Sequence, residues 1–266
     1  MIRFCNLFSG SSGNCTFVSS KNTKILVDAG VSCLKISNAL AELNVSLDEI
    51  DAILITHEHV DHTKGLTTIT KKHHIPIYTS AKTWKMMESL KIPDAYQLTF
   101  NPNNAFKIGD FDIFPFSIPH DAADPCGFNL SSDGKKVTIA TDMGHVDNSI
   151  LGYMEKSDIL LLESNYDVET LKCSPYPFFL KQRISGNNGH LSNEMASKAI
   201  CHLCQNGVNN VILGHLSKEN NFPELAYQTV LNELTQNNIS CNLSVANRDK
   251  NDDMLELAWY RSFLWI

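Results

Sequence analysis

The sequence predicts a layered α/β fold, and three observations support this prediction. Segments with the short apolar runs or alternation of strands are interleaved with segments of helical periodicity along most of the chain. A length of 266 residues fits one large α/β domain or two small ones, and 43% hydrophobic with 19% charged residues is ordinary for a globular protein. Polar residues directly follow several of the apolar runs, and layered α/β folds build their sites at such strand ends.

The first half of the chain contains most of the expected strands. The turn at residues 9–14 separates two of them and is rich in glycine and serine. The backbone N–H groups of such a turn, which ends in Asn14, can face a phosphate, although an ordinary hairpin loop has the same composition. Strands are expected at residues 2–8, 14–19, 24–28, 52–56, 97–100, 104–108 and 110–118, and helices at 32–44 (with Ser32 as N-cap), 63–72 and 80–90.

In the second half, strands and helices alternate. Strands are expected at residues 137–142, 158–163, 211–213 and 240–246, and helices at 190–204 and 223–236. The remaining tail is first charged and then apolar from Trp259 to Ile266, which predicts a linker followed by a docked terminal strand or hairpin.

The segment from His57 to His62 (His-Glu-His-Val-Asp-His) indicates a metal site. It holds three imidazoles and two carboxylates directly after the apolar run 52–55. Imidazole nitrogen and carboxylate oxygen suit Zn, Mn or Fe. Residues 57, 59 and 61 have the spacing of an extended segment, whose alternate side chains point the same way, and His62 starts a new direction. The segment therefore predicts ligands for two adjacent metal ions; a polar loop rich in histidine by chance is the alternative.

Other candidate site residues stand at the ends of predicted strands: Asp28, His120, Asp142, Glu163 and His215. Taken alone, each also has an ordinary interpretation. Asp28 suits a ligand or a cap, His120 a surface histidine, and the polar group that begins at Glu163 a helix cap.

Residues 174–190 form the most unusual segment, with Tyr176, Lys181, Arg183 and His190 among prolines and glycines. Tyrosine and arginine contact phosphates and bases by hydrogen bonds and stacking, whereas a solvated cationic turn is the alternative. His190 is expected at the N-terminus of the helix 190–204. The positive end of the helix dipole would there keep its ring neutral, able to bind anions or exchange protons.

The net charge of −7 argues against a nonspecific nucleic-acid binder. Two bound divalent cations would offset about four charges locally, so the charge does not decide the matter. The eight cysteines have no framework spacing, and the chain shows neither a signal-peptide pattern nor a long apolar run, so we expect reduced thiols in a cytoplasmic protein without membrane contact. The single C-x-x-C, Cys201 to Cys204, falls in a helical pattern and predicts core or surface thiols.

On these motifs the chain resembles the metallo-β-lactamase fold superfamily, whose signature is H-x-H-x-D-H after an apolar strand. More narrowly, it resembles the YycJ (WalJ) group of bacterial metal-dependent nucleases. The matching segments are residues 8–15, 25–30, 55–66, 119–128, 139–146, 160–167, 174–194 and 213–221.

The resemblance implies a single αββα sandwich domain, residues 1–246, with the tail 247–266 docked on it. It implies two divalent metal ions, Zn or Mn with Fe possible, and it distributes their ligands. The first ion would take His57, His59 and His120, the second Asp61, His62 and His215, and Asp142 would bridge them. Asp28 and Glu163 would support these ligands, and Asp61, Asp142 and His190 would be the catalytic residues.

The implied activity is phosphodiester hydrolysis by a DNA exonuclease. Asn14, Tyr176, Lys181, Arg183 and His190 are the expected substrate contacts. An aspartate at position 142 argues against a true β-lactamase, many of which have cysteine there, and the motif spacings leave no room for a tRNA-binding arm or an RNA-processing cap domain. A thioesterase or lactonase for small molecules is the alternative, and a regulatory module without turnover is a third. Metal identity, polarity of digestion and oligomeric state stay open.

Overall fold

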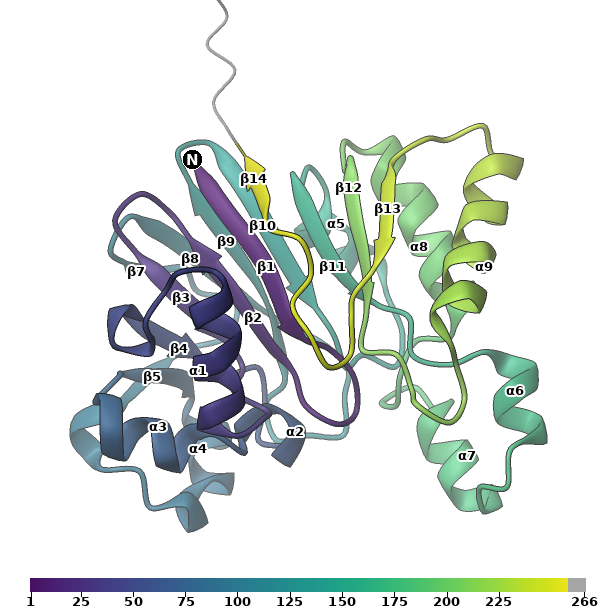
Figure 1. The fold of residues 1–266 in the computed structure, drawn as a ribbon. Helices are drawn as coiled ribbons and strands as arrows, with labels where there is room; N and C mark the ends of the chain where they lie inside the picture. The colour runs from purple at the N-terminus through teal and green to yellow at the C-terminus, as the bar shows by residue number, and fades with distance from the viewer. Residues whose placement is uncertain (258–266) are drawn as a thin grey trace, which may run out of the picture.

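Two seven-stranded sheets pack face to face, and helices lie on the outer face of each (Figure 1). The structure is a computed structural model that describes residues 1–257. The first sheet has the order β14 (Leu255–Leu257), β1 (Ile2–Phe8), β2 (Cys15–Ser19), β3 (Lys24–Val27), β4 (Ala52–Leu54), β5 (Ile77–Ser80), β6 (Gln97–Phe100). The second has the order β13 (Asn242–Val245), β12 (Asn210–Gly214), β11 (Ile159–Glu163), β10 (Lys135–Ala140), β9 (Cys126–Ser132), β8 (Phe111–Ser117), β7 (Phe106–Ile108).

Apolar side chains fill the space between the sheets. Phe4 of β1, Phe111 of β8 and Phe128 of β9 are buried in this inner core. A second apolar cluster joins the first sheet to the helices α1 (Cys33–Glu42), α3 (Leu66–His73) and α4 (Ala81–Met86). A third joins the other sheet to α5 (Asn148–Met154), α8 (Asn193–Gln205) and α9 (Pro223–Gln236). Because each sheet is covered on both faces, the fold is the four-layer αββα sandwich that the resemblance implied.

Strand direction brings the polar strand ends together. Strands β3 to β6 run parallel in the first sheet, and β10 to β13 run parallel in the second. Asp28 follows β3, and the segment that begins at His57 follows β4. Asp142 follows β10, Glu163 ends β11, and His215 follows β12. The carboxyl ends of parallel strands meet at one edge of a sheet, so these five residues lie at neighbouring edges of the two sheets.

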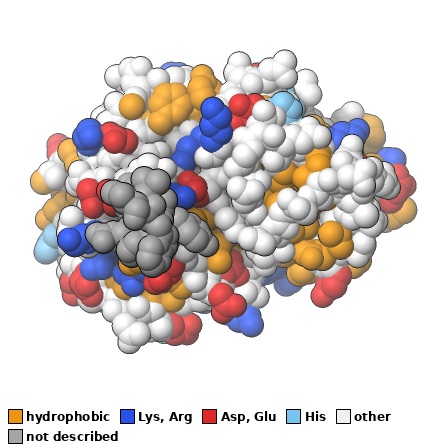
Figure 2. Space-filling view, turned by 90° about the horizontal axis from the view of Figure 1, so that it is seen from above, with side chains coloured by type: hydrophobic (Ala, Val, Ile, Leu, Met, Phe, Trp, Pro, Cys, Tyr) orange, Lys and Arg blue, Asp and Glu red, His pale blue; other side chains and the backbone are white. Residues whose placement is uncertain are grey.

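Short helices surround this edge. The helices α2 (Val60–Thr63), α6 (Val168–Cys173) and α7 (Phe178–Ile184) lie toward one end of the molecule, opposite the N-terminus and β14 (Figure 1). Three 3₁₀ turns complete the described elements, at Leu47–Glu49, Glu88–Leu90 and Asp94–Tyr96. Figure 2 views the opposite end of the molecule, where lysine and arginine side chains are interspersed with aspartate and glutamate.

Several elements differ from the sequence prediction. The expected helix 63–72 is two helices, α2 and α3, separated at Gly65, where a Cβ would lie 2.6 Å from the carbonyl oxygen of Val31. The expected helix 80–90 ends at Met86 and continues only as a 3₁₀ turn. The sequence analysis did not predict β5, β9, β14, α5, α6 or α7.

The helix expected from residue 190 begins three residues later. Asn193 is its first residue, and the Ser192 side chain accepts a hydrogen bond from the backbone N–H of Met195 as the N-cap. His190 therefore lies before the helix rather than at its N-terminus. Ser32, by contrast, caps α1 as predicted, because its side chain accepts from the N–H of Lys35.

The described part of the tail continues the first sheet. Strand β14 pairs antiparallel with β1, with Ile2 opposite Leu257. Asn247 is joined to Asp252 by hydrogen bonds from both its backbone and side-chain amides. The predicted terminal apolar segment from Trp259 to Ile266 lies outside the described residues. Among residues 1–257 the structure contains no helix with the length and apolar character needed to cross a bilayer.

Candidate metal centre and active site

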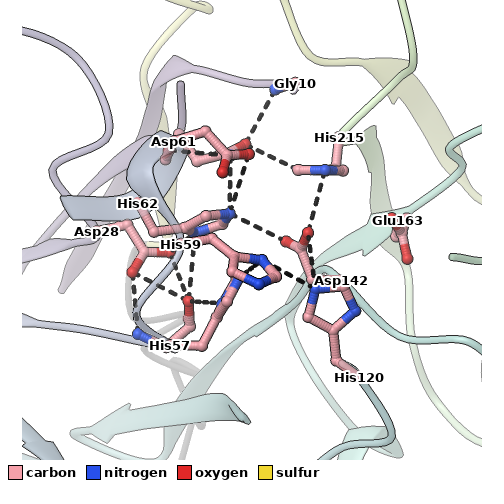
Figure 3. A network of polar contacts seen from close by, with 12 residues as sticks. Gly10, Asp28, His57, His59, Asp61, His62, His120, Asp142, Glu163 and His215 are labelled. Atoms are coloured by element: carbon pink, nitrogen blue, oxygen red, sulfur yellow. Dashed lines mark hydrogen bonds and ion pairs between the residues drawn. The ribbon is translucent and has the colours of Figure 1, made fainter. Parts of the chain in front are cut away.

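The metal-ligand candidates converge where the strands end (Figure 3). Asp28, Asp142 and His215 each follow a strand and have positive φ angles of 63°, 61° and 53°. Such backbone conformations cost a non-glycine residue on the order of 1–3 kcal/mol and persist only where surrounding contacts enforce them. Three of them at neighbouring strand ends indicate that the fold holds these side chains in a fixed arrangement.

Three imidazoles form a first group of possible ligands. Nδ1 of His59 lies 3.0 Å from Nε2 of His57 and 3.3 Å from Nε2 of His120. A neutral imidazole has one donor and one acceptor nitrogen, so three nitrogens that face one another cannot all be satisfied by hydrogen bonds. A cation at their centre would satisfy all three, and the atoms lie within the 4.8 Å that one ion can span.

Asp61, His62 and His215 form a second group. Asp142 lies between the groups: its Oδ1 is 3.1 Å from Nε2 of His215 and 3.9 Å from Nε2 of His120, and its Oδ2 is 3.3 Å from Nε2 of His62. This Oδ2 is buried and accepts no hydrogen bond of good geometry. A buried carboxylate oxygen without a donor is costly, and a shared cation would remove that cost.

The outward nitrogens of these histidines are held by hydrogen bonds. Nδ1 of His62 lies 2.7 Å from Asp28, and Nδ1 of His120 lies 3.1 Å from the carbonyl oxygen of Gly189. Nδ1 of His215 lies 3.1 Å from Oδ1 of Asn14. Each partner accepts, which assigns the proton to Nδ1 and leaves the lone pair of Nε2 facing the centre. Polar partners that fix the tautomer in this way are typical of metal-ligating histidines.

Asp28 and Thr56 connect two of the ligands. Asp28 accepts from the backbone N–H of Thr56 at 2.9 Å and from its hydroxyl at 3.0 Å. Because that hydroxyl donates to Asp28, its oxygen is free to accept from Nδ1 of His57, 3.0 Å away. Asp28 was predicted to support the metal ligands, and its contacts with Thr56 and His62 fit that role. The sequence analysis missed Thr56, although a polar residue between the strand and His57 was a usable signal.

Asn14 contacts two of the ligand candidates. Its side chain is buried, its Oδ1 accepts from the backbone N–H of Gly10 at 2.9 Å, and its Nδ2 lies 3.1 Å from Nε2 of His62. The predicted substrate contact of Asn14 therefore stays a prediction, and its observed contacts are all within the protein. Asn14 links the glycine-rich turn to His62 and His215.

The charges at the centre favour a bound cation. Burial lowers the pKa of His57 well below its usual range, so its ring stays neutral, as a metal ligand must be. Burial would also lower the pKa of His62, but Asp28 and Asp142 outweigh it and raise that pKa well above the usual range. The buried carboxylates thus draw a positive charge onto the His62 ring, and a metal ion would take the place of that proton.

His190 is paired with the buried carboxylate of Glu163. Nδ1 of His190 lies 2.6 Å from Oε1 of Glu163, whose Oε2 accepts from the backbone N–H groups of Met143 at 2.9 Å and Leu191 at 3.2 Å. Burial opposes protonation of His190, but the charge and hydrogen bond of Glu163 raise its pKa to about 9. The environment of His190 thus differs from the predicted one, because its ring faces a carboxylate rather than a helix terminus.

A cavity of about 230 Å³ opens over the two ligand groups. Arg183 is on its wall and pairs with Asp121. His190 also lines it, so two of the five predicted substrate contacts face the cavity. The lining residues are Ser11, His59, Asp61, His120, Asp121, Asp142, Leu180, Arg183, Ile184, Gly189, His190 and His215.

Lys181 and Tyr176 lie elsewhere. Nζ of Lys181 donates to the carbonyl oxygen of Lys172 at 2.6 Å. The Lys181 residue lines a separate groove of about 440 Å³ between α6 and α7. Tyr176 is half-buried and lines neither space. Lys181 and Tyr176 therefore do not line the cavity over the ligand groups, and their role as substrate contacts stays a prediction. His145 is half-buried and contacts the carbonyl oxygen of Asn187.

Comparison with known proteins settles the family. Residues 23–216 match the family model described as a beta-lactamase superfamily domain. The chain belongs to this superfamily. It is 38% identical over 255 residues to the exodeoxyribonuclease WalJ of Streptococcus pneumoniae. This alignment covers 94% of this chain and 95% of WalJ. It is 35% identical over 231 residues to the exodeoxyribonuclease YycJ of Bacillus anthracis, covering 86% and 88% of the two chains.

A solved structure confirms the fold of this superfamily member. The metallo-β-lactamase fold protein YhfI from Bacillus subtilis superimposes with a TM-score of 0.70 at 15% identity, and the match covers 94% of this chain and 98% of YhfI. The resemblance inferred from the sequence motifs is therefore confirmed. Family membership and the histidine and aspartate cluster together support a divalent metal centre.

Proposed function

We propose that this superfamily protein is a metal-dependent DNA exonuclease. The position of Asp142 carries the proposal, because its two oxygens reach both ligand groups at the floor of one cavity. A shared carboxylate between two nitrogen-rich groups is the arrangement that two-metal hydrolysis of a phosphodiester requires. The relatives WalJ and YycJ, similar over nearly their whole length, are named exodeoxyribonucleases.

Two divalent ions would use the side chains that face the centre. The first ion would be held by His57, His59 and His120. The second would be held by Asp61, His62 and His215, with Asp142 shared between the ions. Ligation by nitrogen and oxygen alone suits Zn or Mn, with Fe as a further possibility. When bound, such a pair neutralises the charge that develops on the attacking and leaving oxygens of an in-line displacement.

The protein's own groups add position and a proton. His190 donates through Nδ1 to Glu163, which leaves Nε2 for the cavity that the ring lines. From there it can give a proton to the leaving oxygen or hold a phosphate oxygen. The guanidinium of Arg183, which also lines the cavity, can act as a second phosphate contact.

DNA as substrate also accounts for the location expected from the sequence. Cellular DNA lies in a reducing compartment, and all eight cysteines of the chain are free thiols. The thioesterase or lactonase alternative keeps one supporting observation. Leu180 and Ile184 give the cavity an apolar wall that an acyl chain could contact.

An activity panel on the purified protein loaded with Mn or Zn tests the proposal. We expect linear double-stranded DNA to be degraded from its ends while a covalently closed circle stays intact. His59→Ala, which removes a nitrogen from the first group, is the inactive control. Intact linear DNA at enzyme concentrations equal to substrate, or faster cleavage of thioesters or lactones than of any phosphodiester, would overturn the exonuclease proposal in favour of acyl transfer.

A further inference from the structure

Helix α7 carries apolar side chains that the fold does not use. None of the residues from Phe178 to Ile184 is buried. Phe178 is 75% exposed and Phe179 is 71% exposed, more than any other described phenylalanine. A helix this short is marginal by itself in water, and its stability normally comes from packing an apolar face. Two exposed phenyl rings add nothing to that packing, so they indicate a surface that contacts a ligand.

The same helix forms a wall of the catalytic cavity. Leu180, Arg183 and Ile184 line the cavity. Residues four apart on a helix are neighbours on its surface, so Phe179 lies one turn from Arg183 on the same side. Phe178 lines the adjacent groove together with Lys181. Phe179 is therefore next to the wall of the cavity, whereas Phe178 borders the groove on the other side of α7.

We propose that Phe179, with Phe178 beside it, stacks on unpaired nucleotide bases of the DNA strand whose phosphodiester enters the cavity. This inference rests on the exonuclease function proposed above and specifies how the substrate is held. Bases within a duplex stack on one another and present no free face. The strand that reaches α7 must therefore be unpaired over its terminal nucleotides.

The charge of the site favours nucleotide bases as the partner of these rings. Among the described residues that line the cavity, Arg183 is the only lysine or arginine, and Asp121 already neutralises it. With a net charge of −7, the chain gains little from attraction to phosphates at long range. Stacking on aromatic rings is independent of charge and tolerates any sequence, as an exonuclease needs.

The test uses Mn-loaded full-length protein and duplex oligonucleotides with a short unpaired end, in both 5′ and 3′ versions. Phe179→Ala should raise KM by about tenfold, and the double variant with Phe178→Ala by more, with little change in kcat. Phe179→Trp should restore KM, whereas Phe179→Leu should not, because leucine is apolar but cannot stack. Leu34→Ala is the matched control, since Leu34 is 70% exposed on α1 in the other outer layer.

Abasic substrates separate stacking from other effects. Removing the unpaired bases should raise the KM of the wild-type protein by the same factor as the double substitution does on the normal substrate. The KM of the double variant should be the same for the normal and the abasic substrate. Unchanged KM in the alanine variants would overturn the stacking proposal while leaving the exonuclease intact. A change in sedimentation with unchanged KM would overturn it as well and identify the rings as a contact between subunits. Failure of the wild-type protein to cut any DNA end would instead reject the proposed function.

Discussion

Glu163 holds His190 and the segment that follows Asp142 at the same time. Its Oε1 lies 2.6 Å from Nδ1 of His190, and its Oε2 accepts from the N–H of Met143, the residue after Asp142. The carboxylate itself is fully buried at the end of β11. One side chain therefore sets the distance between the proposed proton donor and the carboxylate shared by the two ligand groups.

This relationship predicts a selective loss of turnover. His190→Ala should lower kcat on DNA by about 10²–10⁴-fold while the protein still binds its metal ions, because His190 acts on the substrate. Glu163→Gln should act in the same direction, since the neutral glutamine has a single acceptor oxygen and cannot accept both from Nδ1 of His190 and from the backbone N–H groups of Met143 and Leu191. The measurements are steady-state kinetics and elemental analysis of the same samples. His202→Ala removes an exposed histidine that also pairs with a glutamate, Glu155, and should change neither.

A second prediction separates two basic residues that the sequence analysis treated alike. Arg183 faces the catalytic cavity and Lys181 faces the groove behind α7. Arg183→Ala should raise KM for DNA and reduce the slope of log KM against log salt by about one, because one phosphate contact is lost. Lys181→Ala should leave that slope unchanged. Equal effects of the two variants would contradict the orientation of α7.

The different positions of these two residues show what the sequence could not supply. Residues 174–190 were analysed without an assigned helix, and only a helix makes Lys181 and Arg183, two positions apart, point to different sides. The histidines and aspartates of the centre were predictable because they follow apolar strands or stand within six residues of one another. Glu163 was predicted as a supporting residue, but its pairing with His190 joins distant segments, and no local pattern records such a contact.

The third prediction concerns Thr56, which sequence reasoning missed. Thr56→Val keeps the shape of the side chain but removes the hydroxyl between Asp28 and His57. Loss of such a supporting contact should weaken metal binding by about 10–100-fold with little change in fold. Competition with a chelator measures the affinity. Thr70→Val is the matched control, because Thr70 is equally buried and its hydroxyl contacts only the carbonyl oxygen of Leu66 in α3. Equal loss of affinity in both variants would contradict the role of Thr56.

The last prediction is that bound metal stabilises the fold and that Asp142 mediates this effect. Without a cation, the buried carboxylates of Asp28 and Asp142 rely on the neighbouring histidines for positive charge. A ligand at about one hundred times its Kd adds about 2.7 kcal/mol to the free energy of unfolding. For a chain of this size that raises Tm by several degrees, of the order of 5–10 °C.

Thermal melts with Mn or Zn and with a chelator should show this rise in the wild-type protein. In Asp142→Asn the rise should largely disappear, because the neutral amide keeps the shape of the side chain but neither bridges two cations nor balances their charge. His145→Ala, which alters a half-buried histidine that contacts the carbonyl oxygen of Asn187 and does not line the cavity, should respond to metal as the wild type does. A full metal-dependent rise in Asp142→Asn would show that the two ligand groups bind metal without the shared carboxylate, which would remove the observation on which the proposed function rests.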